Sequence, residues 1–176
     1  GVNAGVAIES GGNNNTLIGD NTGKAITTGD NNLIAGYNSG QALTTGARNV
    51  LLGYHAGDAI TDGSYIIAIG DNALGALTSG QDNVAVGRGA LQTNTSGAHN
   101  TAIGNLAMTA HESGGECTAV GYLALNDNTT GAGNTVVGSY AGDVNTTGGY
   151  NTAMGHNALG ANTTAANNTA IGNSAM

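Results

Sequence analysis

The strongest constraint in this sequence is a glycine that recurs every 17 residues without a single change of spacing. The repeat glycines are Gly19, Gly36, Gly53, Gly70, Gly87, Gly104, Gly121, Gly138, Gly155 and Gly172. A period held this strictly is typical of proteins built from stacked structural repeats. Residues are located below by their distance from the repeat glycine, which is position 0.

The composition alone would indicate a disordered chain. The sequence has 32 glycines and no proline, phenylalanine or tryptophan, and such small side chains bury little apolar surface to offset chain entropy. The repeat argues against disorder, because Ile, Val, Leu, Ala and Met return to the same position just before each repeat glycine. Stacked coils require that pattern, and a disordered chain does not.

A short strand is predicted at positions −3 to −1 of each repeat. Strand side chains alternate between two faces, so positions −3 and −1 share one face and position −2 occupies the other. Both faces carry apolar or small residues, which indicates that something covers the second side. We expect an oligomer partner to do so, in contact with the small residues at position −2. These are Ala68, Ala85, Ala102, Ala119, Ala153 and Ala170.

The rest of each repeat predicts turns and a core. Asn recurs at position −4, where stacked amides would form a ladder between coils. Thr-Thr-Gly or a close variant fills positions +8 to +10, and its glycine suits a turn with positive φ. The large apolar residue moves from +7 in the first three repeats to +4 from the fifth. We infer that these two positions fill neighbouring volume in one core.

These patterns predict an all-β fold, a parallel β-solenoid (β-roll or β-helix) of about ten 17-residue coils. Residues 1–14 are expected to form a partial N-terminal coil that includes Ala7-Ile8-Glu9-Ser10-Gly11, and residues 15–176 the ten repeats, the last incomplete. Because neither end shows a polar cap, we expect the chain to continue in the native protein or to dock its ends onto other subunits. A helical repeat is excluded, since no 3.6-residue apolar stripe is present.

The charge balance excludes some partners. Three basic residues against eleven acidic ones give a formal net charge of −8. Nucleic acids and anionic membranes need clustered Lys or Arg, so neither is expected as a partner. No stretch is long and apolar enough to span a bilayer. Cys117 is alone and occupies the Asn position of its repeat, so we expect a tolerated small residue there.

Catalytic chemistry is not indicated, and the chain is predicted not to be an enzyme. The histidines His55, His99, His111 and His156 fall at four different positions of the repeat, and we expect them on surface loops. No cofactor or metal site is predicted. A calcium site built from Asp58, Asp62 and Asp71 is a weaker alternative, because the calcium-binding nonapeptide motif is missing.

Two side-chain columns could carry function. Tyr37, Tyr54 and Tyr122 share position +1 beside a turn and form a candidate exposed surface for a glycan or a protein; the alternative is that they only cover turn backbone. Thr recurs at position +8, interrupted by Glu112. A regular Thr array resembles several β-helical antifreeze proteins, which makes ice binding a distant alternative.

The units Val84-Ala85-Val86-Gly87, Thr101-Ala102-Ile103-Gly104 and Thr118-Ala119-Val120-Gly121 resemble the head repeats of trimeric autotransporter adhesins. Heads of that family are left-handed parallel β-rolls that trimerise side by side, so the resemblance implies a homo-oligomer, with a trimer favoured. The repeats are also similar to those of phage and viral tail fibres. We therefore expect a non-enzymatic segment of a cell-surface or virion-surface fibre, serving as rigid stalk or adhesive head.

Overall fold

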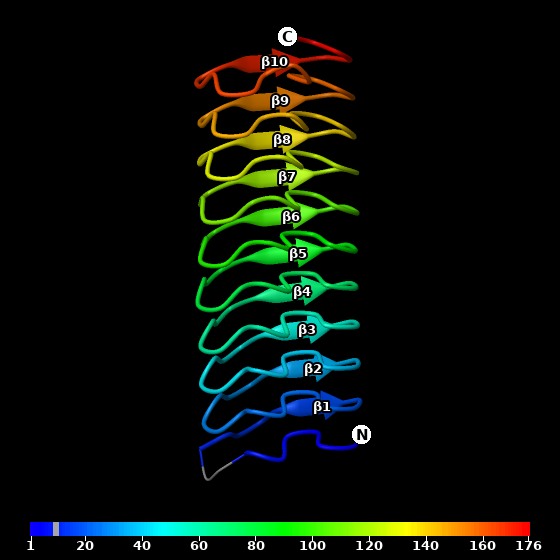
Figure 1. Ribbon diagram of the computed structural model, residues 1–176, viewed down its shortest axis with the longest axis vertical. Coiled ribbons are helices and arrows are strands. Elements are labelled where there is room, and N and C mark those ends of the chain that lie inside the picture. The colour runs from blue at the N-terminus through cyan, green and yellow to red at the C-terminus, as the bar shows by residue number, and fades with distance from the viewer. Residues whose placement is uncertain (9–10) are drawn as a thin grey trace.

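The computed structural model describes residues 1–8 and 11–176. Their coils stack into a rod with the N-terminus at one end and the C-terminus at the other (Figure 1). The described part of the chain contains no helix, and every strand has three residues. The strands are β1 (Thr16–Ile18), β2 (Leu33–Ala35), β3 (Val50–Leu52), β4 (Ile67–Ile69), β5 (Val84–Val86), β6 (Thr101–Ile103), β7 (Thr118–Val120), β8 (Thr135–Val137), β9 (Thr152–Met154) and β10 (Thr169–Ile171).

The strands form one parallel sheet in sequence order, β1 to β10. Each strand residue pairs with the residue 17 positions later, as Thr101 pairs with Thr118 and Ala102 with Ala119. The prediction of a parallel β-solenoid with a 17-residue coil is thereby confirmed. At a strand spacing of about 4.8 Å, ten strands make a sheet roughly 48 Å long.

The middle residue of each strand, at position −2, faces the interior of the chain's own coil. Ala68, Ala85, Ala102 and Ala119 have no exposed surface, and Ala153 and Ala170 are also buried. The prediction that these six alanines contact an oligomer partner is therefore wrong, because the coil closes around them. The residues at positions −3 and −1 point outward instead and are half-buried or exposed in every strand.

The core is filled by two alternative arrangements of large side chains, as the sequence predicted. Ile26 and Ile60 at position +7 are fully buried in early coils, and Leu91 and Met108 at position +4 are fully buried in later ones. The two positions share volume: a Cβ added at Gly57, a +4 glycine, would lie 2.6 Å from Cδ1 of Ile60. Most coils therefore hold a large residue at only one of these positions. The coil of Gly70 is the exception, because Leu74 at +4 and Leu77 at +7 are both fully buried.

Two glycine columns permit close contact between coils. Gly104, at position 0, has φ of 142°, and a Cβ there would overlap the carbonyl oxygen of Gly121 in the next coil. Gly97, at position +10, would overlap the carbonyl oxygen of Gly114 in the same way, but its φ is not positive. The prediction of a positive φ at +10 is wrong; the left-handed conformation falls two residues later, as at His99 (φ 60°). Backbone proximity, rather than φ, excludes side chains at +10.

The Asn column at position −4 forms a ladder that differs in detail from the one expected. Oδ1 of Asn83 accepts a hydrogen bond from the backbone N–H of Asn100 in the next coil (3.0 Å), and Nδ2 of Asn100 donates across the coil to the carbonyl of Gly114 (3.0 Å). The ladder thus joins side chains to backbone. Direct amide-to-amide bonds occur near the ends of the column, as between Asn32 and Asn15.

Cys117 replaces Asn in this ladder and is buried. Its backbone N–H still donates to Oδ1 of Asn100 (3.0 Å), and its Sγ lies 3.3 Å from the carbonyl of Gly131, where an Asn amide would donate. Burial is the main cause that raises the pKa of the thiol. A neutral S–H can therefore take the place of the amide as a weaker donor.

The described residues before β1 follow the same inter-coil pattern. The N–H of Gly5 donates to the carbonyl of Thr22, and the carbonyl of Val2 accepts from Asn21. Residues 9–10, which the sequence placed in a partial N-terminal coil, lie outside the described residues.

The core assignment predicts unequal effects of two otherwise matched leucines. Leu91 is fully buried and Leu106 is only half-buried, yet both have positive φ, 51° and 57°. Leu91→Ala should lower the free energy of unfolding by about 2–5 kcal/mol because it leaves a cavity. Leu106→Ala should lower it by about 1 kcal/mol or less. Chemical denaturation monitored by circular dichroism measures both, and equal losses would contradict the core assignment.

Candidate functional site

The outer face of the sheet carries an apolar band along the whole rod, which we call the sheet stripe. It consists of the side chains at positions −1 and −3. Position −3 is aliphatic in β2 to β5 and Thr in the other strands. The residues are Ile18, Ala35, Leu52, Ile69, Val86, Ile103, Val120, Val137, Met154 and Ile171 at −1, and Leu33, Val50, Ile67 and Val84 among those at −3. None of these residues is buried. No charged side chain interrupts the stripe.

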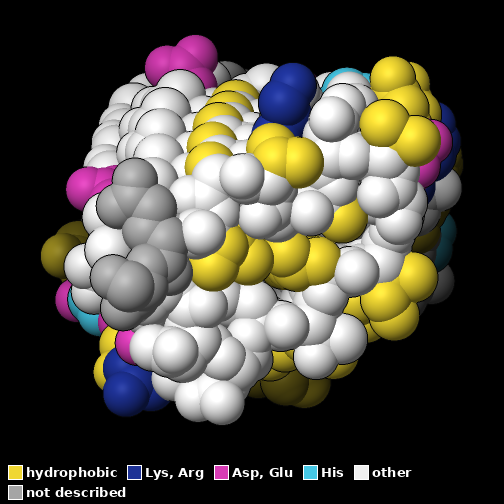
Figure 2. All heavy atoms as spheres, turned by 90° about the horizontal axis from the view of Figure 1, so that it is seen from below, with side chains coloured by type: hydrophobic (Ala, Val, Ile, Leu, Met, Phe, Trp, Pro, Cys, Tyr) yellow, Lys and Arg dark blue, Asp and Glu magenta, His cyan; other side chains and the backbone are white. Residues whose placement is uncertain are grey.

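The exposure of the stripe is substantial for aliphatic side chains. Ile103 is 40% exposed and Met154 48% exposed in the middle and upper part of the rod. Seen from the end, hydrophobic atoms occur inside the cross-section and also in rows on the outside, while acidic side chains are scattered around the perimeter (Figure 2). The sequence showed that both strand faces are apolar, but it did not show which face the coil encloses.

The predicted tyrosine surface is divided between two places. Tyr37 and Tyr54 stack with ring centroids 5.5 Å apart, and His55 lies 4.3 Å from the Tyr54 ring. Tyr122 lies four coils further along and packs edge-to-face against Tyr140 at 5.3 Å. All four rings are exposed. They form two small aromatic clusters on the +1 and +2 edge.

The histidines are dispersed, as their spacing indicated, but His111 is not on the surface. It has no exposed area, so the prediction of a surface loop position is wrong for this residue. Its place in the repeat, +7, is the one that held core aliphatics in the early coils. His55 pairs with Asp58 at 2.5 Å, and His99 lies 3.7 Å from Asp82.

His111 belongs to an internal polar column that continues through Asn128, Asn145 and Asn162. Nε2–H of His111 donates to the carbonyl of Gly114 (2.7 Å), so Nδ1 is left to accept from Nδ2 of Asn128 (2.8 Å). Asn145 in turn donates to Asn128 (3.2 Å). Both imidazole nitrogens are used in the neutral form, and the ring serves as a substitute for Asn.

The threonine hydroxyls at position +8 donate hydrogen bonds to backbone carbonyls of the next coil. Thr44 Oγ1 donates to the carbonyl of Thr61 (2.8 Å), and Thr146 Oγ1 donates to the carbonyl of Thr163 (2.9 Å). Thr95 bonds in the same way to Glu112, where the column changes residue type. These hydroxyls reinforce the stacking of the coils.

Metal-ligating residues are not gathered together. Nowhere in the described residues do three or more His, Cys, Asp or Glu side chains approach closely enough to hold a metal ion. The alternative of a calcium site at Asp58, Asp62 and Asp71 is therefore not formed. Asp58 bonds to His55, and Asp71 accepts from Asn72.

An open groove lies on the turn edge of the rod, at positions +11 and +12. Ala98, His99, Gly115, Glu116, Ala132 and Tyr150 line it, and its volume is about 350 Å³. Sequence reasoning missed this groove. The signal that could have found it is the run of small residues at +11 beside large, chemically varied residues at +12.

Comparison with protein-family models, with curated proteins and with solved structures gives no match. Among the described residues there is also no helix of the length and apolarity that crossing a membrane demands. Function is accordingly inferred from the surfaces described above.

The geometry of His111 predicts a pH-dependent stability. Burial is the largest cause of the shift in the pKa of the folded-state imidazole, which lies below the ordinary value of 6.5. The unfolded chain therefore takes up a proton first as the pH falls. The contribution of neutral His111 to the free energy of unfolding is fully present above pH 6.5, and it is lost as the pH falls from there toward the folded-state pKa. His111→Asn restores the column residue and should reduce the fall in Tm between pH 7 and pH 5. Calorimetry measures this difference, and an unchanged pH dependence in the variant would contradict it.

Proposed function

We propose that this chain is a non-enzymatic structural segment of an extracellular surface fibre or adhesin, and that its solenoids associate side by side through the sheet stripe. The single observation that carries the proposal is the exposed, uncharged, apolar outer face of the sheet. Its presence along every coil is more than the fold of one chain requires, because the core is already closed on the inner face.

The size of the stripe supports association. Strands of three residues rise about 10 Å, so ten of them present a face of roughly 48 Å by 10 Å, on the order of 500 Å² in plan. Contiguous exposed apolar patches above a few hundred Å² mark interaction sites in soluble proteins. A second copy of this chain is the partner that fits best, because it offers an apolar stripe with the same length and the same 17-residue period.

The position of the stripe also corrects the intersubunit contact that the sequence suggested. The small residues at −2 are inside the coil, and the residues available to a partner are those at −1 and −3. Position −3 is threonine in β1 and from β6 onward, where the side chain is β-branched but carries a hydroxyl. A partner would therefore meet an apolar stripe along β2 to β5 and a mixed apolar and hydroxyl stripe along the other strands.

The rod itself suits a stalk or head. Backbone groups bond each coil to the next, and the Asn ladder at −4 and the Thr hydroxyls at +8 add hydrogen bonds between most coils. Interactions that repeat in every coil resist bending at any one of them. The resemblance to adhesin heads favours a trimer at a cell surface, with a host glycan or protein as the ligand of an adhesive head. A phage or viral tail-fibre segment on a virion surface is the alternative that the same features support.

Sedimentation of the isolated chain tests the assembly. We expect an oligomer, and Ile103→Asp should weaken its association at least about tenfold, since a carboxylate would be desolvated in the contact. The fold should survive, because Ile103 points outward. Ile103→Thr, which copies the residue type at −3, should have a smaller effect.

Asn105→Asp serves as the matched control, since Asn105 is exposed two residues later and outside the stripe. It should leave the sedimentation coefficient unchanged. A wild-type chain that is well folded and monomeric at about 100 μM, or equal effects of the two aspartates, would overturn the proposed assembly.

A further inference from the structure

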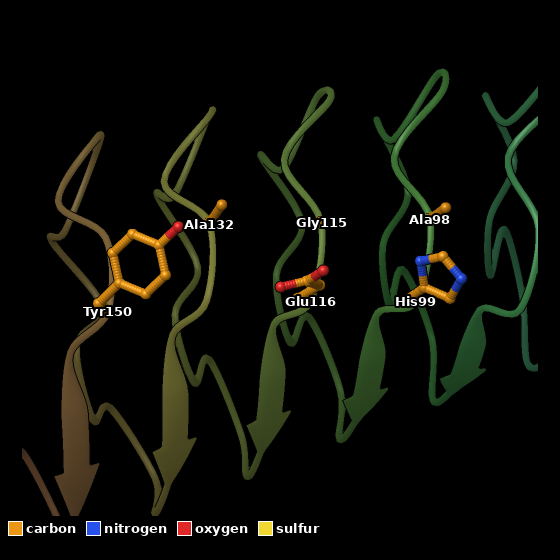
Figure 3. A pocket seen from close by; sticks show the side chains of 6 residues that line it. All are labelled: Ala98, His99, Gly115, Glu116, Ala132 and Tyr150. Carbon is orange, nitrogen blue, oxygen red and sulfur yellow. The ribbon is translucent and has the colours of Figure 1, made fainter.

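The groove on the turn edge is built from four consecutive coils. Ala98, Gly115 and Ala132, at position +11, form its floor, and His99, Glu116 and Tyr150, at position +12, border it. In Figure 3 these larger side chains lie in a row along the rod, and the Tyr150 ring extends toward the coil of Ala132. The +12 residue between Glu116 and Tyr150 is Gly133, where an added Cβ would lie 2.6 Å from the Tyr150 ring. Because Gly133 has no side chain, the Tyr150 ring can occupy this space.

The floor of the groove presents backbone donors whose preferred partner is visible elsewhere in the repeat. The N–H of Ala47, at +11, donates to the hydroxyl of Ser64 at +11 of the next coil (3.1 Å). The N–H of Asn13, one coil before Asp30 at the same repeat position, donates to the Asp30 carboxylate (2.6 Å). Side-chain oxygen atoms thus accept from the +11 N–H in two coils, whereas the N–H groups of Ser64, Gln81 and Ala98 at the same position have no acceptor within residues 11–176.

In the groove no side chain supplies that oxygen. Ala132 follows Gly115 in the column and Gly149 follows Ala132, and neither carries a polar atom. Within residues 11–176, the N–H groups of Gly115 and Ala132 have no hydrogen-bond acceptor. Gly115 and Ala132 occupy the same repeat position as Ala47, but no side-chain oxygen takes the place that Ser64 Oγ holds there.

The borders of the groove limit what that ligand can be. Glu116 supplies an exposed carboxylate acceptor, and Tyr150, 67% exposed, supplies an aromatic face. A ligand that meets both the N–H donors and the Glu116 carboxylate must accept and donate hydrogen bonds within a few Å, which a hydroxyl group does. An anionic ligand would be repelled by Glu116 and by the net charge of −8, and a cation would leave the N–H donors unpaired.

We propose that this groove binds a neutral saccharide, with hydroxyls on the Gly115 and Ala132 N–H groups and on Glu116, and a C–H face of a sugar ring against Tyr150. Tyrosine combines an apolar face with a polar tip, which suits such a ligand. The volume of about 350 Å³ is at the small end of ligand sites, which span roughly 300–1,000 Å³. It accommodates one or two sugar rings.

The inference rests on the proposed adhesive role of the fibre, for which it names the ligand class. Saturation-transfer NMR on the assembled chain provides the test, with methyl β-galactoside, methyl β-glucoside, methyl α-mannoside and N-acetylglucosamine as probes. Acetate and tetramethylammonium serve as anionic and cationic probes. At about 10 mM, at least one saccharide should receive magnetisation, as expected for a Kd near 1 mM, and neither ion should.

Three variants locate the binding. Tyr150→Ala and Glu116→Gln should each weaken it about tenfold. Ala132→Ser copies Ser64, so its hydroxyl should occupy the Gly115 N–H and weaken saccharide binding to a similar degree without a change in fold. Tyr65→Ala is the matched control at the same repeat position outside the groove, and it should bind as the wild type does.

The outcomes of the saccharide-binding experiments can be distinguished from those of the sedimentation test of assembly. Two results overturn the saccharide inference alone. In the first, the chain sediments as an oligomer but transfers magnetisation to none of the four saccharides. In the second, it binds them equally well after Ala132→Ser and Tyr150→Ala. Binding of acetate or tetramethylammonium in place of the saccharides overturns it too. A monomeric chain that binds a saccharide, and loses it on Ala132→Ser, supports the groove and contradicts the fibre.

Discussion

The structure depends on how closely one coil must approach the next. Parallel pairing at 17-residue intervals brings the carbonyl of each repeat glycine against the Cα of the glycine in the preceding coil, where a Cβ has no room. The same crowding occurs at position +10, although φ is ordinary there. Both glycine columns therefore follow from backbone contact. The polar ladders of Asn and Thr then satisfy backbone and side-chain groups that the tight coil would otherwise leave without partners.

A coil so small can enclose little apolar volume, and this limit explains the variation within the repeat. Large side chains at +7 coexist with glycine at +4, and large side chains at +4 coexist with polar residues at +7, except in the coil of Gly70, which buries both Leu74 and Leu77. His111 and the buried asparagines occupy space that aliphatics hold in the early coils. Each of them makes at least one hydrogen bond within the stack, which offsets part of the cost of burying polar groups. Nδ2 of Asn94 is the exception among these amides, because it is buried without a hydrogen-bond partner.

The sequence predicted the fold class, the coil length, the strand positions and the exchange of core residues, because each depends on a periodic pattern. It could not decide which strand face is inside. Ala102 and Ile103 are both apolar, and only the path of the chain around the coil encloses the first and exposes the second. The groove was missed for a related reason: small residues at +11 indicate space, but they do not show that the N–H groups of Gly115 and Ala132 lack hydrogen-bond acceptors. His111 was misplaced because its repeat position, rather than its side-chain chemistry, determines its burial.

The assignment of the two strand faces supports both the closed core and the exposed stripe, and thiol labelling tests it most directly. In a Cys117→Asn background, which restores the ladder residue, Ala102→Cys and Ile103→Cys place a thiol on adjacent residues of β6. Under dilute conditions that keep the chain monomeric and folded, the thiol at position 103 should react readily. The thiol at position 102 should react only after unfolding. Equal labelling of the two native variants, or faster labelling at position 102, would contradict the arrangement.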